Sequence, residues 1–305
     1  MPETRTRHQE PSDREKKTYR YLRVAMVLMA VGLGVSVLYE RVKAPEDCWQ
    51  ISISAYYYTP VQGFFVAAMV TIGVCLIALQ ATTRREDVAL NLAGACAPFV
   101  AFVPTPDVNV CGYNLTDAGA RNLSVGNNVF ALLVIAGLTL VVAAVLPRLP
   151  RTRFATAPSR ADRVGYAVAT ALYVGTAYAF FVQRTFFLRW GHLAAAVLMF
   201  VLIAAVVRFN GQDARSRRLR SAYRAVFAGM VAAAVLNGAA GLAGWDHWAL
   251  CLEACLIGLF TVFWIVQTVE LWNAGVRPPD GTPATPPPAS ALPRSGEPEA
   301  PAPAR

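Results

Sequence analysis

The chain of 305 residues is 55% hydrophobic and only 15% charged, and its formal net charge is +9. Soluble domains carry about 25% charged residues, so this composition argues against a soluble enzyme or binding domain. The positive charge does not indicate nucleic-acid binding, because most Lys and Arg residues lie at the ends of apolar segments, as they do in membrane proteins. We therefore expect membrane lipids as partners and no nucleic acid.

Eight segments are apolar and long enough, or nearly so, to cross a membrane, which takes about 20 predominantly apolar residues. The third is the shortest and carries Asn91 and Pro98. The fifth and sixth are separated only by residues 184–190, which we expect to form a tight interfacial turn. The fold class predicted is an all-α, polytopic transmembrane helical bundle of about eight spans. The segments are 23–40, 61–81, 88–104, 127–147, 163–183, 191–209, 222–244 and 248–271.

The distribution of basic residues predicts the orientation of the spans. If the N-terminus is cytoplasmic, 23 of the 28 Lys and Arg residues fall in cytoplasmic segments, as the positive-inside rule requires. The prediction is an N-in, C-in protein of a bacterial inner membrane, with an uncleaved first span as signal anchor. Three regions follow: a basic cytoplasmic N-terminal tail over 1–22, a transmembrane helical domain over 23–272, and a Pro-rich cytoplasmic tail over 273–305 that we expect to be disordered.

The six cysteines fall into two groups. Four lie within predicted spans, where a thiol behaves as a small hydrophobic group: Cys75, Cys96, Cys251 and Cys255. Cys48 and Cys111 lie in the first and second outer loops. The outer face is the oxidising side of the membrane, where disulfides persist. We therefore predict a Cys48–Cys111 disulfide that joins the two loops, and no metal site.

The few polar side chains at membrane depth share one level near the outer face. His192 opens the sixth span, Glu253 lies about 8 Å below the start of the eighth at about 1.5 Å per residue, and Asn237 lies at a similar depth on the neighbouring span. Such groups are functional candidates because they are costly in lipid. We expect Glu253 to point toward Asn237 and the region of His192. The predicted outward-facing polar cavity has six candidate ligand-binding residues: Ser54, Tyr57, Asp107, His192, Asn237 and Glu253.

A structural explanation exists for several of these residues. Tyr and Trp collect at membrane interfaces as an aromatic belt. Ser52 and Ser54 could simply cap the second span, with Pro60 in its first turn. A histidine near the surface is more often an interfacial hydrogen-bonding group than a ligand.

Several motifs carry a resemblance to known membrane proteins. These are SISAYYYTPVQGFFVAAMVTIGVCLIAL (52–79), RREDVALNLAG (84–94), FVPTPD (102–107), GHLAAAVLMF (191–200) and CLEACLIGLFTVFW (251–264). In this pattern the chain resembles uncharacterised bacterial multispan membrane proteins with a Ser-Ile-Ser-Ala-Tyr-Tyr motif, and more distantly the DRAM-like membrane family. DRAM-like proteins usually have six helices, whereas eight are expected here. The resemblance implies a helical membrane fold and the same choice of polar residues, but no reaction.

Three functions remain open from the sequence. The first is a membrane protein that binds a lipid or other amphiphile in the outward-facing cavity without a cofactor. The second is an intramembrane hydrolase resembling the ceramidase and progestin-receptor superfamily, with zinc held by His192 and His247 together with Asp107 or Glu253; the chain lacks HxxxH and HExxH spacings. The third is a proton-coupled transporter that uses Glu253, although the two halves of the chain share no inverted repeat.

Overall fold

The computed structural model describes residues 13–44, 48–106, 118–146 and 159–275. These residues form eight α-helices and one 3-10 helix, and they contain no strand. The all-α fold predicted from the sequence is therefore confirmed for the described part of the chain. The elements are α1 (Asp13–Lys43), η1 (Ser54–Tyr58), α2 (Gln62–Ala78), α3 (Arg84–Phe102), α4 (Ala118–Val145), α5 (Arg160–Phe181), α6 (Arg184–Asp213), α7 (Arg217–Leu242) and α8 (Trp248–Glu270).

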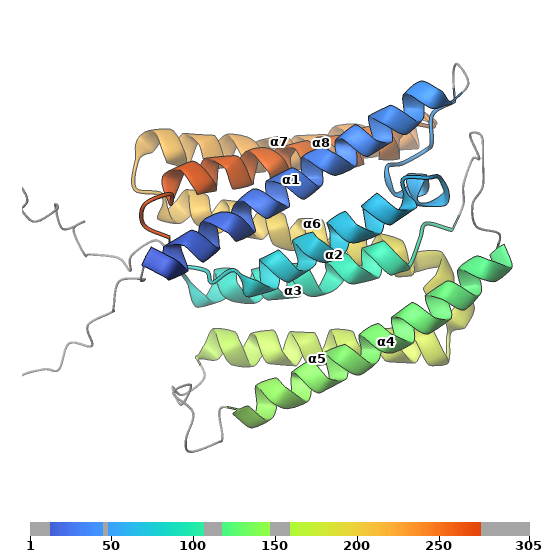
Figure 1. The fold of residues 1–305 in the computed structure, drawn as a ribbon, viewed down its shortest axis with the longest axis horizontal. Coiled ribbons are helices and arrows are strands. Elements are labelled where there is room, and N and C mark those ends of the chain that lie inside the picture. Colours follow the sequence, from blue (N-terminus) through green and yellow to red (C-terminus); the bar gives the residue numbers. More distant parts are fainter. Residues whose placement is uncertain (1–12, 45–47, 107–117, 147–158, 276–305) are drawn as a thin grey trace, which may run out of the picture.

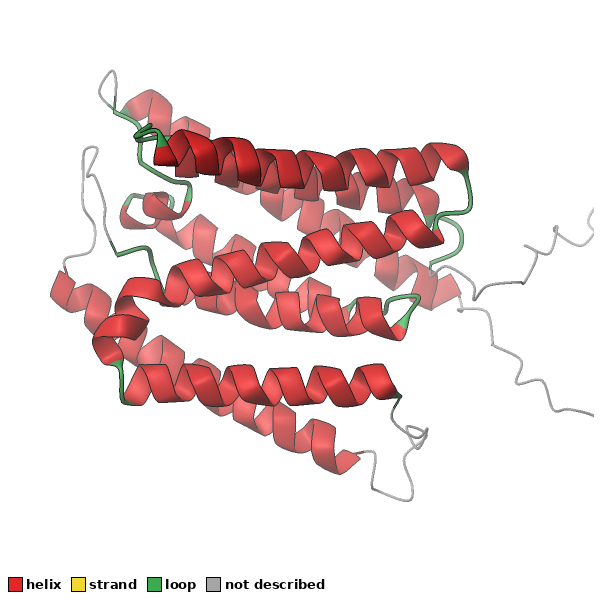
Figure 2. Cartoon of the chain, turned by 180° about the vertical axis from the view of Figure 1, so that it is seen from behind, coloured by secondary structure: helices red, strands yellow, loops and turns green. Residues whose placement is uncertain are grey.

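Six of the helices form a closed ring. Around it the order is α1, α2, α3, α6, α7 and α8, and α8 packs back against α1. Neighbours in the ring run antiparallel, while α4 and α5 form a hairpin along one side that touches only α3 and α6 of the ring (Figure 1). The view from behind shows the same arrangement (Figure 2). We call the end of the bundle with η1 the η1 end, and the opposite end, where α1 begins and α8 ends, the base.

Most of the helices have the dimensions of membrane spans. Six are long and apolar enough to cross a bilayer: α1, α4, α5, α6, α7 and α8. The helix α2 is apolar but has 17 residues, and α3 begins with Arg84, Arg85, Glu86 and Asp87. Because a helix satisfies its own backbone hydrogen bonds, such a bundle can lie in lipid. The chain is thus a helical protein of the membrane-spanning kind.

The ring is closely packed where small residues meet. A Cβ atom on Gly73 of α2 would lie 2.8 Å from the carbonyl oxygen of Gly94 on α3, and one on Gly94 would lie 2.6 Å from the carbonyl oxygen of Gly73. Only glycine permits this approach of two backbones, as is common between membrane helices. On α8, Phe260, Phe263 and Trp264 are buried and form an aromatic layer between the two ends of the ring.

The helix α1 begins at Asp13, so residues 13–22 of the predicted N-terminal tail are helical. One predicted turn is wrong. The predicted turn over 184–190 is instead the start of α6. The helical path is interrupted at Gln183, whose backbone is not helical. The reason lies in packing: Phe187 is buried, with its ring centroid 5.5 Å from that of Phe180 on α5.

Candidate functional site

Glu253 faces the protein at the η1 end and holds η1 in place. The Ser54 backbone N–H donates to its Oε2 at 2.8 Å, and the Ser54 hydroxyl donates to its Oε1 at 3.1 Å. Glu253 is five residues past the start of α8, or about 7.5 Å along the helix. Its carboxylate therefore satisfies a backbone donor at the first turn of η1, which a membrane interior would otherwise leave unpaired.

Asn237 does not join Glu253 as the sequence led us to expect. Its amide nitrogen donates to the Ala233 carbonyl of its own helix at 2.9 Å. Among the described residues no hydrogen bond connects Asn237 and Glu253. The structure thus brings Glu253 to Ser54 and leaves Asn237 on α7 as a locally bonded side chain.

His192 lies deeper along its helix than predicted. It is eight residues past the start of α6, about 12 Å along the axis, and its side chain is only 5% exposed. Its Nδ1 donates to the Val103 carbonyl at 2.6 Å, which places the proton of the neutral ring on Nδ1 and a lone pair on Nε2. In the part of the chain described, the buried Nε2 has no hydrogen-bond partner.

The segment directly after α3 is fastened by side chains from three other elements. Tyr58 of η1 donates to the Thr105 carbonyl at 2.6 Å. Arg121 of α4 donates to the Pro106 carbonyl at 2.9 Å and to the Tyr58 hydroxyl at 3.3 Å. Together with the bond from His192 to Val103, these contacts hold residues 103–106 across the η1 end. Most of the hydrogen bonds described at this end therefore join a side chain to a backbone group.

Tyr57 belongs to the core of this end. Its ring is buried and lies edge-on to Tyr58, with centroids 5.5 Å apart, and to Phe65 at 6.4 Å. Burial raises the pKa of the Tyr57 phenol above its ordinary value, so the phenol remains protonated and neutral. Its packing differs from that of a side chain on the rim of an open cavity.

Two of the predicted site residues, Asp107 and Cys111, lie outside the described residues. The proposed roles of Asp107 and the Cys48–Cys111 disulfide therefore stay predictions. The four cysteines placed in helices by the sequence are free thiols: Cys75, Cys96, Cys251 and Cys255.

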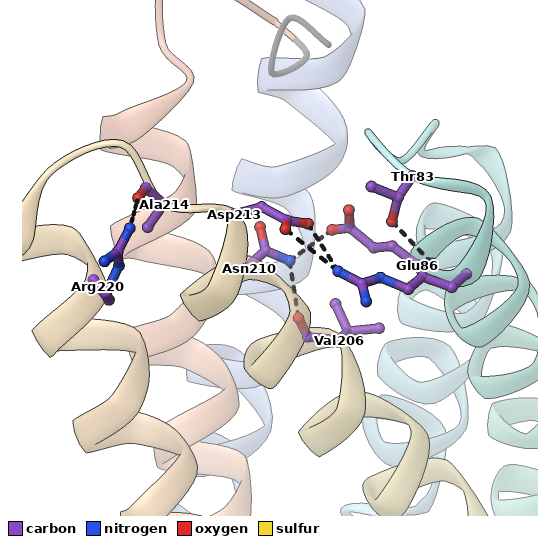
Figure 3. Close-up of polar contacts among 8 residues, drawn as sticks. Thr83, Glu86, Val206, Asn210, Asp213, Ala214 and Arg220 are labelled. Carbon is purple, nitrogen blue, oxygen red and sulfur yellow. Dashed lines mark hydrogen bonds and ion pairs between the residues drawn. The ribbon is translucent and has the colours of Figure 1, made fainter. Parts of the chain in front are cut away.

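At the base, a buried chain of polar side chains joins four helices. Arg23 of α1 donates through Nε to Gln267 of α8 at 3.1 Å, and Gln267 donates to Asn210 of α6 at 3.0 Å. Asn210 in turn donates to Glu86 of α3 at 2.6 Å. Figure 3 shows Asn210 reaching Glu86 where α6 ends and α3 begins. Each of the four side chains is at most 3% exposed, and we call them the base network.

Further contacts surround the base network. Arg85 forms an ion pair with Asp213 at 3.3 Å, and the Tyr223 hydroxyl donates to Glu270 at 2.5 Å. Arg23 also donates to the Gly275 carbonyl at 2.8 Å, which draws the chain after α8 back onto α1. A cavity of about 10 Å³ beside Arg23 has room for one water molecule.

Sequence reasoning missed the base network. The sequence explains Arg23 by membrane topology along with the other basic residues, and it singles out Glu86 only as part of the RREDVALNLAG motif (84–94). A signal existed, because Arg23, Glu86 and Gln267 are all strongly polar and lie at or near predicted span ends. What the sequence lacks is the pairing, since Arg23 and Gln267 are 244 residues apart.

The described residues contain no group of three or more His, Cys, Asp or Glu side chains placed to hold a metal ion. Comparisons of the chain with protein-family models, curated proteins and solved structures give no match. The resemblance to Ser-Ile-Ser-Ala-Tyr-Tyr proteins and to the DRAM-like family therefore stays a prediction, and function has to be argued from the two ends of the bundle.

Proposed function

We propose that this protein is an eight-span, N-in, C-in protein of a bacterial inner membrane that binds a lipid or other amphiphile at the η1 end. The spans of α2 and α3 are supported by their place in the ring, where neighbouring helices cover them and Glu86 at the charged start of α3 is buried. The base then faces the cytoplasm, in keeping with the basic residues at the ends of the helices.

The observation that carries the proposal is the state of His192. An unpaired polar atom buried in a protein costs about 1–3 kcal/mol, and the Nε2 of His192 is such an atom among the described residues. Its lone pair accepts hydrogen bonds while Nδ1 is engaged with Val103. A ligand with a hydroxyl or amide N–H would satisfy it. This requirement favours an amphiphile whose polar group is a donor.

The surroundings of His192 suit the apolar part of such a ligand. Val103, whose carbonyl it holds, belongs to a small apolar cluster with residues of α4, α5 and α6, including Val125, Phe180 and Phe187. Because Nε2 is enclosed, a ligand reaches it only if residues 103–106 or the α4–α5 hairpin move aside. The hairpin is attached through this small cluster and a few polar contacts, such as the Arg84–Asp162 ion pair, whereas the ring has a much larger core.

Two substitutions of His192 separate the roles of its nitrogens. His192→Asn keeps an amide donor near the position of Nδ1 and removes the group at Nε2, whereas His192→Gln keeps a polar group near Nε2 and loses the Nδ1 position. We expect purified wild-type protein to retain an amphiphile enriched over the bulk membrane lipid, measured by native mass spectrometry. His192→Asn should lose it while folding normally, and His192→Gln should keep part of it. Equal retention by wild type and His192→Asn would contradict the proposal.

A zinc-dependent hydrolase is the second candidate, because one observation also fits it. Metal-binding histidines usually donate their other ring nitrogen to a carbonyl or carboxylate, as His192 does to Val103. Elemental analysis of the purified protein distinguishes the two candidates. Stoichiometric zinc that is lost in His192→Asn would favour the hydrolase, with its other zinc ligands beyond the described residues. Absence of zinc from the wild-type protein would favour an organic hydrogen-bond donor at Nε2.

A further inference from the structure

A pocket of about 170 Å³ lies at the base between the end of α6 and the start of α7. Its walls are polar toward the bundle end and apolar toward the bundle middle. The lining residues include Arg208, Gly211, Gln212, Tyr223, Arg224 and Phe227. The pocket is separate from the η1 end and plays no part in the function proposed above.

The pocket carries uncompensated positive charge. Arg208 and Arg224 are both exposed, and within the described ranges neither forms an ion pair. The nearby carboxylates are engaged elsewhere, since Asp213 pairs with Arg85 and Glu270 accepts from Tyr223. Two arginines that line one pocket without a carboxylate present ten guanidinium N–H donors, in a geometry suited to phosphate oxygens.

The floor and the inner wall of the pocket fit the rest of a lipid. A Cβ on Gly211 would lie 3.2 Å from the Cβ of Tyr223, so α6 and α7 meet closely below the arginines. The Arg208 guanidinium lies 5.7 Å from the centroid of the Phe227 ring. Beyond Phe227 the exposed surface of both helices is apolar, with Val201 on α6 and Val231 on α7. Acyl chains can follow this surface.

We infer that this pocket binds the headgroup phosphate of an anionic phospholipid from the leaflet at the base. The two arginines clamp the phosphate, and the apolar surface beyond Phe227 takes the acyl chains. Arginine–phosphate hydrogen bonds are charge-assisted and often bidentate, and basic pockets between membrane helices bind anionic headgroups in this way. The net negative charge of the lipid offsets the excess of arginine where α6 turns into α7.

The test uses the full-length protein in nanodiscs of phosphatidylcholine, with and without phosphatidylglycerol, and counts bound phosphatidylglycerol by native mass spectrometry. The double variant Arg208→Gln/Arg224→Gln should weaken this binding by about tenfold or more, because both charge-assisted guanidinium–phosphate contacts are lost. Arg215→Gln/Arg218→Gln is the matched control: it removes the same charge from residues that do not line the pocket, and binding should be nearly unchanged.

A third variant tests whether the glutamine variant loses binding only because it misfolds. Arg208→Lys/Arg224→Lys keeps both charges but loses the planar donor fork, so its binding should fall between wild type and the glutamine variant. Equal losses in the pocket variant and the control would overturn the inference. It would also be overturned if inorganic phosphate, added at the lipid's concentration, displaced phosphatidylglycerol, because the site would then bind free phosphate.

Discussion

The two ends of the bundle bury polar side chains in different ways. At the base, Arg23, Gln267, Asn210 and Glu86 bind one another and tie four helices together. At the η1 end, polar side chains bind the backbone of two stretches outside the α-helices, the short 3-10 helix η1 and residues 103–106. Hydrogen bonds among side chains fix how the helices pack. Hydrogen bonds from side chains to backbone hold a connecting segment in place, and a ligand's polar groups can replace the backbone as the partner.

The unpaired atoms of the two ends point to the same distinction. At the base, Nη1 of Arg23 lacks a partner among the described residues, but Arg23 lines a cavity that admits one water molecule. At the η1 end, the Nε2 of His192 is buried without a partner among the described residues, in a side chain that bonds Val103 of the small apolar cluster. The cavity beside Arg23 thus has room for a water molecule, whereas the ligand proposed for the η1 end would supply a donor to the second atom. We therefore expect the side-chain network of the base to act mainly on stability, whereas the binding proposed for the η1 end depends on His192.

The largest expected loss of stability follows from Gln267→Leu. The change removes the link between Arg23 and Asn210 and leaves the guanidinium Nε without its buried partner. We expect a loss of about 3 kcal/mol or more in the free energy of unfolding, since breaking a buried charged network typically costs 3–5 kcal/mol. Thermal unfolding of the detergent-purified protein measures it.

Thr268→Val is the control for that prediction. Thr268 is on the same helix and donates only to the Trp264 carbonyl of α8 in the described structure, so its loss should stay below about 1 kcal/mol. If Gln267→Leu were no less stable than Thr268→Val, the base network would not hold the helices together.

A smaller loss is expected from Glu253→Ala. Two hydrogen bonds to Ser54 disappear, one of them to a backbone N–H, which predicts a loss of about 2 kcal/mol. Glu253→Gln keeps one acceptor and should lose roughly half as much by the same estimate. Hydrogen exchange should accelerate at Ser54–Tyr58 in Glu253→Ala and remain unchanged at the base. Unchanged exchange at η1 would show that Glu253 does not anchor it.

The smallest expected difference between the two ends comes from the predicted Cys48–Cys111 disulfide. Peptide mapping under non-reducing conditions, on protein made with its outer face in an oxidising compartment, should recover the two cysteines in one linked peptide pair. Reduction of the disulfide should then accelerate hydrogen exchange at the η1 end and leave hydrogen exchange at the base unchanged. Recovery of both residues as free thiols would remove this predicted link.

The sequence predicted the positions of the described helices well because each contains a long, mostly apolar run. It misplaced the start of α6, because Arg184 and Arg189 lower the local hydropathy, whereas burial of Phe187 against Phe180 extends the helix through them. It correctly singled out Glu253 as a polar group that needs a partner. It named the wrong partner, because Asn237 is nearer in sequence than Ser54, which is 199 residues away.

The base network shows why the remaining polar contacts were out of reach. Charges near span ends are read as topology signals, and this reading explained Arg23 without any partner. The order of helices around the ring brings Arg23 beside Gln267, and that order is a tertiary property which no local pattern reports. The ring itself, with α4 and α5 outside it, was likewise invisible in a series of eight similar apolar segments.

The central claim, that the Nε2 of His192 receives a ligand, is tested most directly by nitrogen NMR of histidine-labelled protein. The chain has only three histidines, so the His192 signals can be assigned by comparison with His192→Asn. In both native membranes and delipidated detergent, Nδ1 should be the protonated nitrogen. The Nε2 resonance should shift toward that of a hydrogen-bonded nitrogen only in native membranes. An Nε2 resonance that is the same in both preparations would contradict the account.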